Sequence, residues 1–301
     1  MAEDFCEKIK EENKSIENDE KTIKNIVISG GGQTLFNFYG ILREASKEGF
    51  YNIQNIQSIY GTSAGALVGF IISLNIDWEI LDNYLIKRPW NKLFDINIQQ
   101  VFALFDNMGV FSKRHVKEVM SPLLLSKDLS PDITLEELYE YNHIELHIYA
   151  TELNTLQMVD FSYLSHPRWK VIDVLAASSA IPLIFTPLFY ENQCFIDGCI
   201  TNDFPICECF KTHDIDETFC IKKTDANYVQ INANSSFIDY VNTLIQKIMI
   251  KSTEIIDPKH LIVVNEPLCT LNSIIETAGS EDVRKTMVEG GGQLFKEFYK
   301  S

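Results

Sequence analysis

The chain has 301 residues, of which 46% are hydrophobic and 23% are charged. These proportions are typical of a soluble globular protein and exclude a disordered or fibrous chain. The formal net charge of −16 opposes binding to nucleic acid or to an anionic bilayer, because both carry charge of the same sign. We therefore expect a folded protein without a nucleic-acid partner.

The N-terminal residues 1–24 are mostly charged and polar, which predicts a mobile segment ahead of a single domain that spans residues 25–301. This segment lacks the apolar core of a secretion signal. The longest mostly apolar run, residues 64–74, is shorter than the about 20 residues that cross a bilayer. The seven cysteines are an odd number without a secretory leader, so we expect reduced thiols and a cytoplasmic location.

The first part of the domain alternates between strand and helix patterns. Residues 25–29 form a short β-branched run that ends in Gly30, Gly31 and Gly32, and residues 35–47 predict a helix. A second strand is predicted for residues 53–60, followed by a glycine turn and a buried helix over residues 64–74. The chain therefore repeats the order of strand, tight turn and helix.

The remainder continues the alternation, with an aromatic-rich stretch at residues 78–111 that fits either a lid or part of the core. The predicted strands are residues 143–153, 159–163, 193–196 and 260–264. The predicted helices are residues 115–125, 169–179, 237–250 and a last one from about residue 280. Residues 211–228 are polar and acidic and predict a surface loop. Such an order favours an α/β fold with a largely parallel sheet.

Ser63, in the segment Gly61-Thr62-Ser63-Ala64-Gly65, is the candidate nucleophile. A serine hydroxyl needs a base and a sharp strand-to-helix turn that presents it, and such a turn requires small residues on either side. Gly61 and Gly65 are those residues. The start of the following helix also favours negative charge that develops nearby.

The three consecutive glycines at 30–32 can direct several backbone N–H groups toward one point, which is what an oxyanion hole requires. A phosphate-binding turn is the other reading of such a run. The segment GGGQTLFNFYG lacks both the Gly-x-Gly-x-x-Gly spacing and a Gly-Lys-Ser/Thr ending. We therefore favour the oxyanion hole.

Four blocks in order resemble the patatin-like phospholipases across residues 25–205: the glycine run, the segment around Ser63, AASSAIPLIFTPL from Ala176, and IDGCITNDFP from Ile196. The resemblance implies a three-layer α/β/α sandwich with a largely parallel central sheet. It also implies phospholipase A-type hydrolysis of lipid acyl esters by a dyad of Ser63 and Asp197, through an acyl-serine intermediate.

The same resemblance assigns further roles. Gly30, Gly31 and Gly32 become the oxyanion hole, with Ala64 as a further contributor, and Gly198 lies in the turn beside the base. An acyl lipid is the implied substrate, and the protein would contact the membrane surface peripherally. No metal and no cofactor are implied.

Two departures from the family pattern leave alternatives open. The family usually has Arg or Lys after the glycines, where this chain has Gln33, and Gly or Ala where it has Cys199. If the turn at Cys199 needs φ > 0, the side chain would strain it. One alternative is thus a catalytically weak lipid-binding or interaction module, and another is a Ser-His-Asp esterase that uses His213 or His260.

Overall fold

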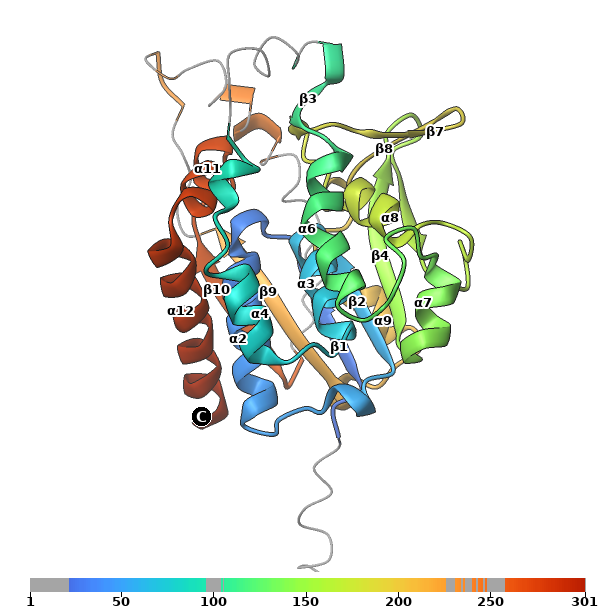
Figure 1. Cartoon of the computed structure of the whole chain (residues 1–301), viewed down its shortest axis with the longest axis vertical. Helices are drawn as coiled ribbons and strands as arrows, with labels where there is room; N and C mark the ends of the chain where they lie inside the picture. The colour runs from blue at the N-terminus through green and yellow to red at the C-terminus, as the bar shows by residue number, and fades with distance from the viewer. Residues whose placement is uncertain are drawn as a thin grey trace, which may run out of the picture.

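The computed structural model describes residues 22–95, 104, 106–225, 231–233, 235, 240–241, 243–245, 247 and 258–300. A central sheet carries the fold (Figure 1), with the strand order β10-β9-β1-β2-β4-β8-β7 and with β5 paired to β4. Its strands are β1 (Asn25–Ile28), β2 (Ser58–Thr62), β4 (Glu145–Glu152), β5 (Gln157–Phe161), β7 (Leu188–Tyr190), β8 (Gln193–Asp197), β9 (Thr218–Asp225) and β10 (Leu261–Glu266).

The strands from β10 to β4 all run parallel, whereas β5 and β8 are antiparallel to β4, and β7 is antiparallel to β8. A separate parallel pair is formed by β3 (Gly109–Phe111) and β6 (Leu183–Phe185). The carboxyl ends of the parallel strands share one end of the sheet, which is where open α/β sheets place their binding sites. The expected α/β fold with a largely parallel central sheet is confirmed.

Helices flank the sheet on both faces. They are α2 (Leu35–Lys47), α3 (Ala64–Ser73), α4 (Trp78–Leu85), α6 (Lys113–Leu125), α7 (Leu135–Asn142), α8 (Val171–Ser178), α9 (Ile206–Phe210), α11 (Leu271–Gly279) and α12 (Glu281–Lys300). The side chains of β1 alternate: Ile26 and Ile28 belong to a large core under α2, α3 and α12, and Val27 belongs to a smaller core under α9. None of the helices described could span a membrane.

The prediction of a surface loop at residues 211–228 was wrong, because residues 218–225 form β9, between β1 and β10. Phe219, Cys220 and Ile221 of this strand are completely buried. The apolar run is short, and the acidic and basic residues on either side of it concealed the strand. The predicted mobile segment 1–24 and the predicted helix 237–250 fall mostly outside the described residues.

α12 packs unusually close to α2, because each helix places a glycine against the backbone of the other helix. A Cβ atom on Gly291 would lie 2.1 Å from the carbonyl oxygen of Asn37, and one on Gly40 would lie 2.1 Å from that of Val288. Real side chains do not reach such distances, so these glycines allow the two helix backbones to touch. The GGGQ segment at residues 290–293 therefore lies inside a helix and serves packing.

We expect Gly291→Ala to lower the free energy of unfolding by about 1–3 kcal/mol, because the added methyl group overlaps the Asn37 carbonyl. Gly290→Ala is the matched control. The nearest atom to its added Cβ is the Asn37 side-chain nitrogen at 3.9 Å, so the better helix propensity of alanine should stabilise the protein by about 0.5–1 kcal/mol. Urea unfolding would compare them, and equal stabilisation by both would rule out the close contact.

Candidate active site

Ser63 occupies a sharp bend between β2 and α3, with φ 52° and ψ −119°. Residues other than glycine rarely adopt a positive φ, and such strain persists only where the surroundings enforce it. The bend is possible because Gly65 and Gly61 let other parts of the backbone pass very close to them. A Cβ atom on Gly65 would lie 2.3 Å from the Ile28 carbonyl oxygen, and one on Gly61 would lie 2.6 Å from the Ala66 nitrogen. The bend places Ser63 at the amino end of α3.

Asp197, the last residue of β8, meets Ser63 directly. Its Oδ2 accepts a hydrogen bond from Ser63 Oγ over 2.7 Å, and its Oδ1 accepts one from the Cys199 backbone N–H over 2.9 Å. Complete burial raises the pKa of Asp197, while hydrogen bonds from Ser63 and from the Cys199 backbone and thiol act to lower it. The structure thus brings together the two residues expected to act as nucleophile and base.

Cys199 does not strain the turn beside the base. It lies in a 3-10 turn, Gly198–Ile200, and it is not among the residues with a positive φ. Its thiol fills the space over the glycine loop, where a Cβ atom on Gly30 would lie 2.1 Å from Cys199 Sγ. Burial raises the pKa of this thiol well above its ordinary value, so it stays protonated and can donate to Asp197.

The three glycines of the loop have different hydrogen-bonding roles. The Gly30 N–H donates to the Asp203 carbonyl over 2.8 Å, so it is already engaged. Within the described residues, the backbone N–H groups of Gly31 and Gly32 have no acceptor. Ala64 is the first residue of α3, where a backbone N–H group has no acceptor within the helix. Of the residues expected to form an oxyanion hole, three therefore keep an available donor.

Ser178 is a site residue that the sequence reasoning did not single out. Its Oγ accepts a hydrogen bond from the Ser63 N–H over 2.9 Å and donates one to the Tyr149 carbonyl over 2.6 Å. The hydroxyl, at the end of α8, thereby ties the bend at Ser63 to the central strand β4. Ser178 belongs to the AASSA segment, and nothing in the local sequence shows that this serine contacts Ser63.

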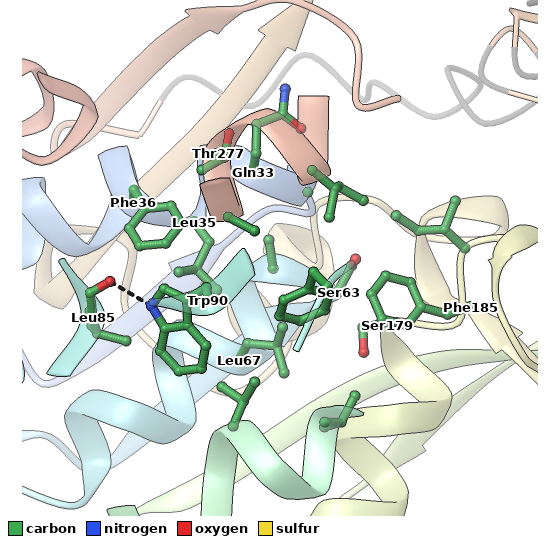
Figure 2. Close-up of a pocket in the computed structure, with 18 of the residues that line it drawn as sticks. Gln33, Leu35, Phe36, Ser63, Leu67, Leu85, Trp90, Ser179, Phe185 and Thr277 are labelled. Carbon is green, nitrogen blue, oxygen red and sulfur yellow. Dashed lines mark hydrogen bonds between the residues drawn. The ribbon is translucent and has the colours of Figure 1, made fainter. Parts of the chain in front are cut away.

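An apolar cavity of about 160 Å³ opens beside Ser63 (Figure 2). An engineered apolar cavity of about 150 Å³ holds a benzene molecule, so this one accommodates a hydrocarbon group of at least that size. The lining residues are Gly32, Gln33, Leu35, Phe36, Ser63, Ala64, Leu67, Ile71, Leu85, Trp90, Phe94, Val116, Val119, Met120, Ser179, Ile181, Phe185, Ile274, Thr277 and Ala278. Almost all of this surface is carbon, which suits an acyl chain.

The aromatic-rich stretch at residues 78–111 contributes directly to this cavity. Trp90 and Phe94 are part of its wall, and the Trp90 ring is fixed by a 2.9 Å hydrogen bond from its Nε1 to the Leu85 carbonyl (Figure 2). Phe111 is buried. Phe102 and Phe105 of the same stretch lie outside the described residues.

Neither histidine considered for a triad lies beside Ser63. His213 Nε2 is 3.4 Å from Ser58 Oγ, and Ser58 begins β2 whereas Ser63 follows its other end. The His260 ring packs against Phe50, with ring centroids 5.4 Å apart. In the part of the chain that is described, no group of three or more His, Cys, Asp or Glu residues is arranged to hold a metal ion.

Comparison with known proteins finds similarity to one family and to viral proteins. The patatin-like phospholipase family model matches residues 26–209. The chain is 27% identical over 197 residues to the "Probable lipid hydrolase 463L" of Invertebrate iridescent virus 6, a match that spans 64% of this chain and 66% of the viral protein, just under two thirds of its length. Protein R571 of Acanthamoeba polyphaga mimivirus is 24% identical over 233 residues, which is 75% of either chain.

Among solved structures, VipD from Legionella pneumophila shares the fold. The TM-score is 0.57 at 17% sequence identity, over 92% of this chain and 67% of VipD.

We expect Ser178→Ala to slow the reaction of Ser63 with a fluorophosphonate probe at least about tenfold, because the buried Ser63 N–H loses its acceptor and the bend loosens. Ser73→Ala is the matched control, since the buried Ser73 hydroxyl donates to the Phe70 carbonyl of its own helix α3 and Ser73 is not among the residues that line the cavity. Labelling rates and melting temperatures would be measured for both. Equal slowing in the two variants would show that Ser178 does not hold the nucleophile.

Proposed function

Because this chain belongs to the patatin-like phospholipase family, we propose that it is a lipid acyl hydrolase that cleaves fatty acyl esters of phospholipids or related lipids through a Ser63–Asp197 dyad. The observation that carries the proposal is the 2.7 Å hydrogen bond between Ser63 Oγ and a completely buried carboxyl group. An apolar cavity beside Ser63 supports a substrate with an acyl chain.

In the first step, Asp197 accepts the proton of Ser63 while Ser63 Oγ attacks the ester carbonyl carbon. The raised pKa of Asp197 makes its carboxylate a stronger base than an exposed aspartate. The negative charge that develops on the carbonyl oxygen is stabilised by the N–H groups of Gly31, Gly32 and Ala64. Gly30 supports the loop instead, because its N–H is bound to Asp203.

The tetrahedral intermediate then collapses. The ester C–O bond breaks, the proton on Asp197 passes to the leaving alcohol oxygen, and the acyl group stays on Ser63. Asp197 next takes a proton from a water molecule as that water attacks the acyl-serine. Ser63 Oγ leaves with the proton that Asp197 holds, and the fatty acid is released. One carboxyl group serves both halves of the reaction, so no histidine is needed.

We expect Ser63→Ala and Asp197→Asn each to lower kcat at least about a thousandfold, because each removes one of two groups that act as a unit. Hydrolysis of phospholipids with different headgroups and of a p-nitrophenyl ester would measure the loss. Fluorophosphonate labelling should disappear in Ser63→Ala.

His213→Ala is the control and should keep most of the turnover. A loss of turnover in His213→Ala or His260→Ala, but not in Asp197→Asn, would select the Ser-His-Asp mechanism. A wild-type protein that neither reacts with the probe nor hydrolyses any ester would favour the lipid-binding module.

The acid side of the pH profile tests the role of Asp197. Only the ionised carboxylate accepts a proton, so kcat/KM should fall as pH drops through a pKa that burial has raised above the ordinary aspartate value. Cys199→Ala removes a thiol hydrogen bond that lowers this pKa, and should move the fall in activity to higher pH. Cys199→Ser retains a donor and should move it less. An unchanged profile in Cys199→Ala would exclude the thiol from tuning the base.

A further inference from the structure

Four large apolar side chains are exposed on two turns at one end of the sheet. Leu153 and Leu156 belong to the turn between β4 and β5, and their side chains are 43% and 60% exposed. Phe189 and Tyr190 end β7, just before its turn into β8, and are 60% and 48% exposed. We call residues 153–156 and 189–192 the docking turns.

The docking turns touch each other and form one surface. The Leu153 N–H donates to the Cys194 carbonyl over 2.7 Å, and the Asn154 side-chain amide donates to the Asn192 carbonyl over 3.2 Å. Cys194 lies opposite Phe189 in the ladder between β7 and β8. Leu153 and Phe189 therefore lie on the same face of the sheet, on either side of Cys194, whereas the Tyr190 ring lies on the other face and packs on Trp169, with ring centroids 4.5 Å apart. Exposed apolar residues on adjoining turns differ from a single apolar residue on a surface, which needs no explanation.

The backbone at Leu156 is unusual for a leucine, with φ 52°. Turn positions with a positive φ favour glycine, asparagine or aspartate, so a large apolar residue there carries local strain in addition to exposed carbon. Met108, just before β3, repeats this combination with φ 60° and 54% exposure. A large apolar residue at an exposed position with a positive φ does not stabilise the folded monomer. Departures of this kind from the usual sequence preferences indicate a functional role.

The docking turns lie beyond the candidate active site along the strand direction. Ala150 of β4 pairs with Asp197, so Leu153 stands three residues, or about 10 Å, farther out. The hairpin of β7 and β8 projects from the end of the molecule at which β3 and α11 also lie (Figure 1). Phe185 of the cavity wall is separated from β7 only by Thr186 and Pro187, so a short segment of chain links the cavity wall to the hairpin.

The charge around the docking turns determines which kind of lipid layer they suit. The sequences around the turns, ELNTLQ at 152–157 and LFYENQ at 188–193, contain no lysine or arginine. The Glu152 carboxylate accepts hydrogen bonds from the backbone N–H groups of Asn154, Thr155 and Cys194, and Glu191 is an exposed carboxylate in the second turn. With a net charge of −16, the chain gains nothing from an anionic bilayer. Leucine side chains with a phenylalanine and a tyrosine suit the interface of a lipid layer without net charge.

We propose that the docking turns insert into the surface of an uncharged or zwitterionic lipid layer and bring the cavity to its substrate. The inference rests on the proposed function, because an ester within a lipid layer is reached only from that layer. Binding depends on apolar contact and is insensitive to ionic strength.

Flotation of the full chain with phosphatidylcholine vesicles tests the proposal, carried out in the Ser63→Ala background so that turnover does not alter the vesicles. We expect the double variant Leu156→Asn, Phe189→Ser to bind at least about tenfold more weakly, since two apolar side chains no longer leave water. Asparagine tolerates a positive φ, so the melting temperature should stay equal or rise. Leu125→Ser, a change at a 58% exposed leucine that ends α6, should bind like the parent.

Several results would overturn the inference. The first two are unchanged binding in the double variant and an equal loss of binding in Leu125→Ser. The third is binding that requires phosphatidylserine and disappears in salt. The fourth is a concentration-dependent dimer that forms in the parent and in Leu125→Ser but not in the double variant. Because vesicle binding is measured with Ser63→Ala, it is independent of whether the dyad catalyses hydrolysis. Conversely, a wild-type protein that binds vesicles and hydrolyses no ester would overturn the proposed function and leave the docking surface in place.

Discussion

The hydrogen bond between Ser63 Oγ and Asp197 Oδ2 joins two residues that are 134 positions apart in the chain, and it depends on β4, the strand with which β2 and β8 both pair. β4 pairs with β2 along residues 145–149 and with β8 along residues 150–152, both on the edge opposite β5, so the ends of β2 and β8 meet where Tyr149 lies opposite Thr62 and Ala150 opposite Asp197. A change in register of either pair would separate the hydroxyl from the carboxyl group by several ångströms. The proposed reaction therefore requires both the parallel pairing of β2 with β4 and the antiparallel pairing of β4 with β8.

Holding these two groups in place opposes folding. Ser63 keeps a positive φ, and the raised pKa of Asp197 means that its ionisation is harder in the folded protein than in the unfolded chain. At pH values above the pKa of an unfolded aspartate, the buried charge consequently lowers the free energy of unfolding. Contacts nearby offset this cost: the Ser178 hydroxyl accepts the Ser63 N–H, and the glycines at 61 and 65 allow α3 to pack on the sheet.

The sequence predicted those parts of the fold that local patterns determine. The predicted helix at 35–47 coincides with α2, and the glycine loop and the bend each have their own short pattern. Asp197 was assigned through the resemblance to the patatin-like phospholipases, because an Asp-Gly turn after a strand does not by itself indicate a catalytic residue. β9 was missed, since only three of its residues form an apolar run. The engagement of the Gly30 N–H by Asp203 and of the Ser63 N–H by Ser178 could not be predicted, because each bond joins segments more than a hundred residues apart.

The part of the chain beyond the family match completes the site. Ile274, Thr277 and Ala278 of α11 form one wall of the cavity. Arg284 holds that wall in place: its buried guanidinium donates to the carbonyls of Thr277 and Ala278, and to that of Ile86, which follows Leu85 of the cavity wall. The family match ends at residue 209 and so includes Ser63 and Asp197, the proposed nucleophile and base. The acyl chain would contact residues that this match does not cover, so selectivity for that chain can change while the chemistry stays the same.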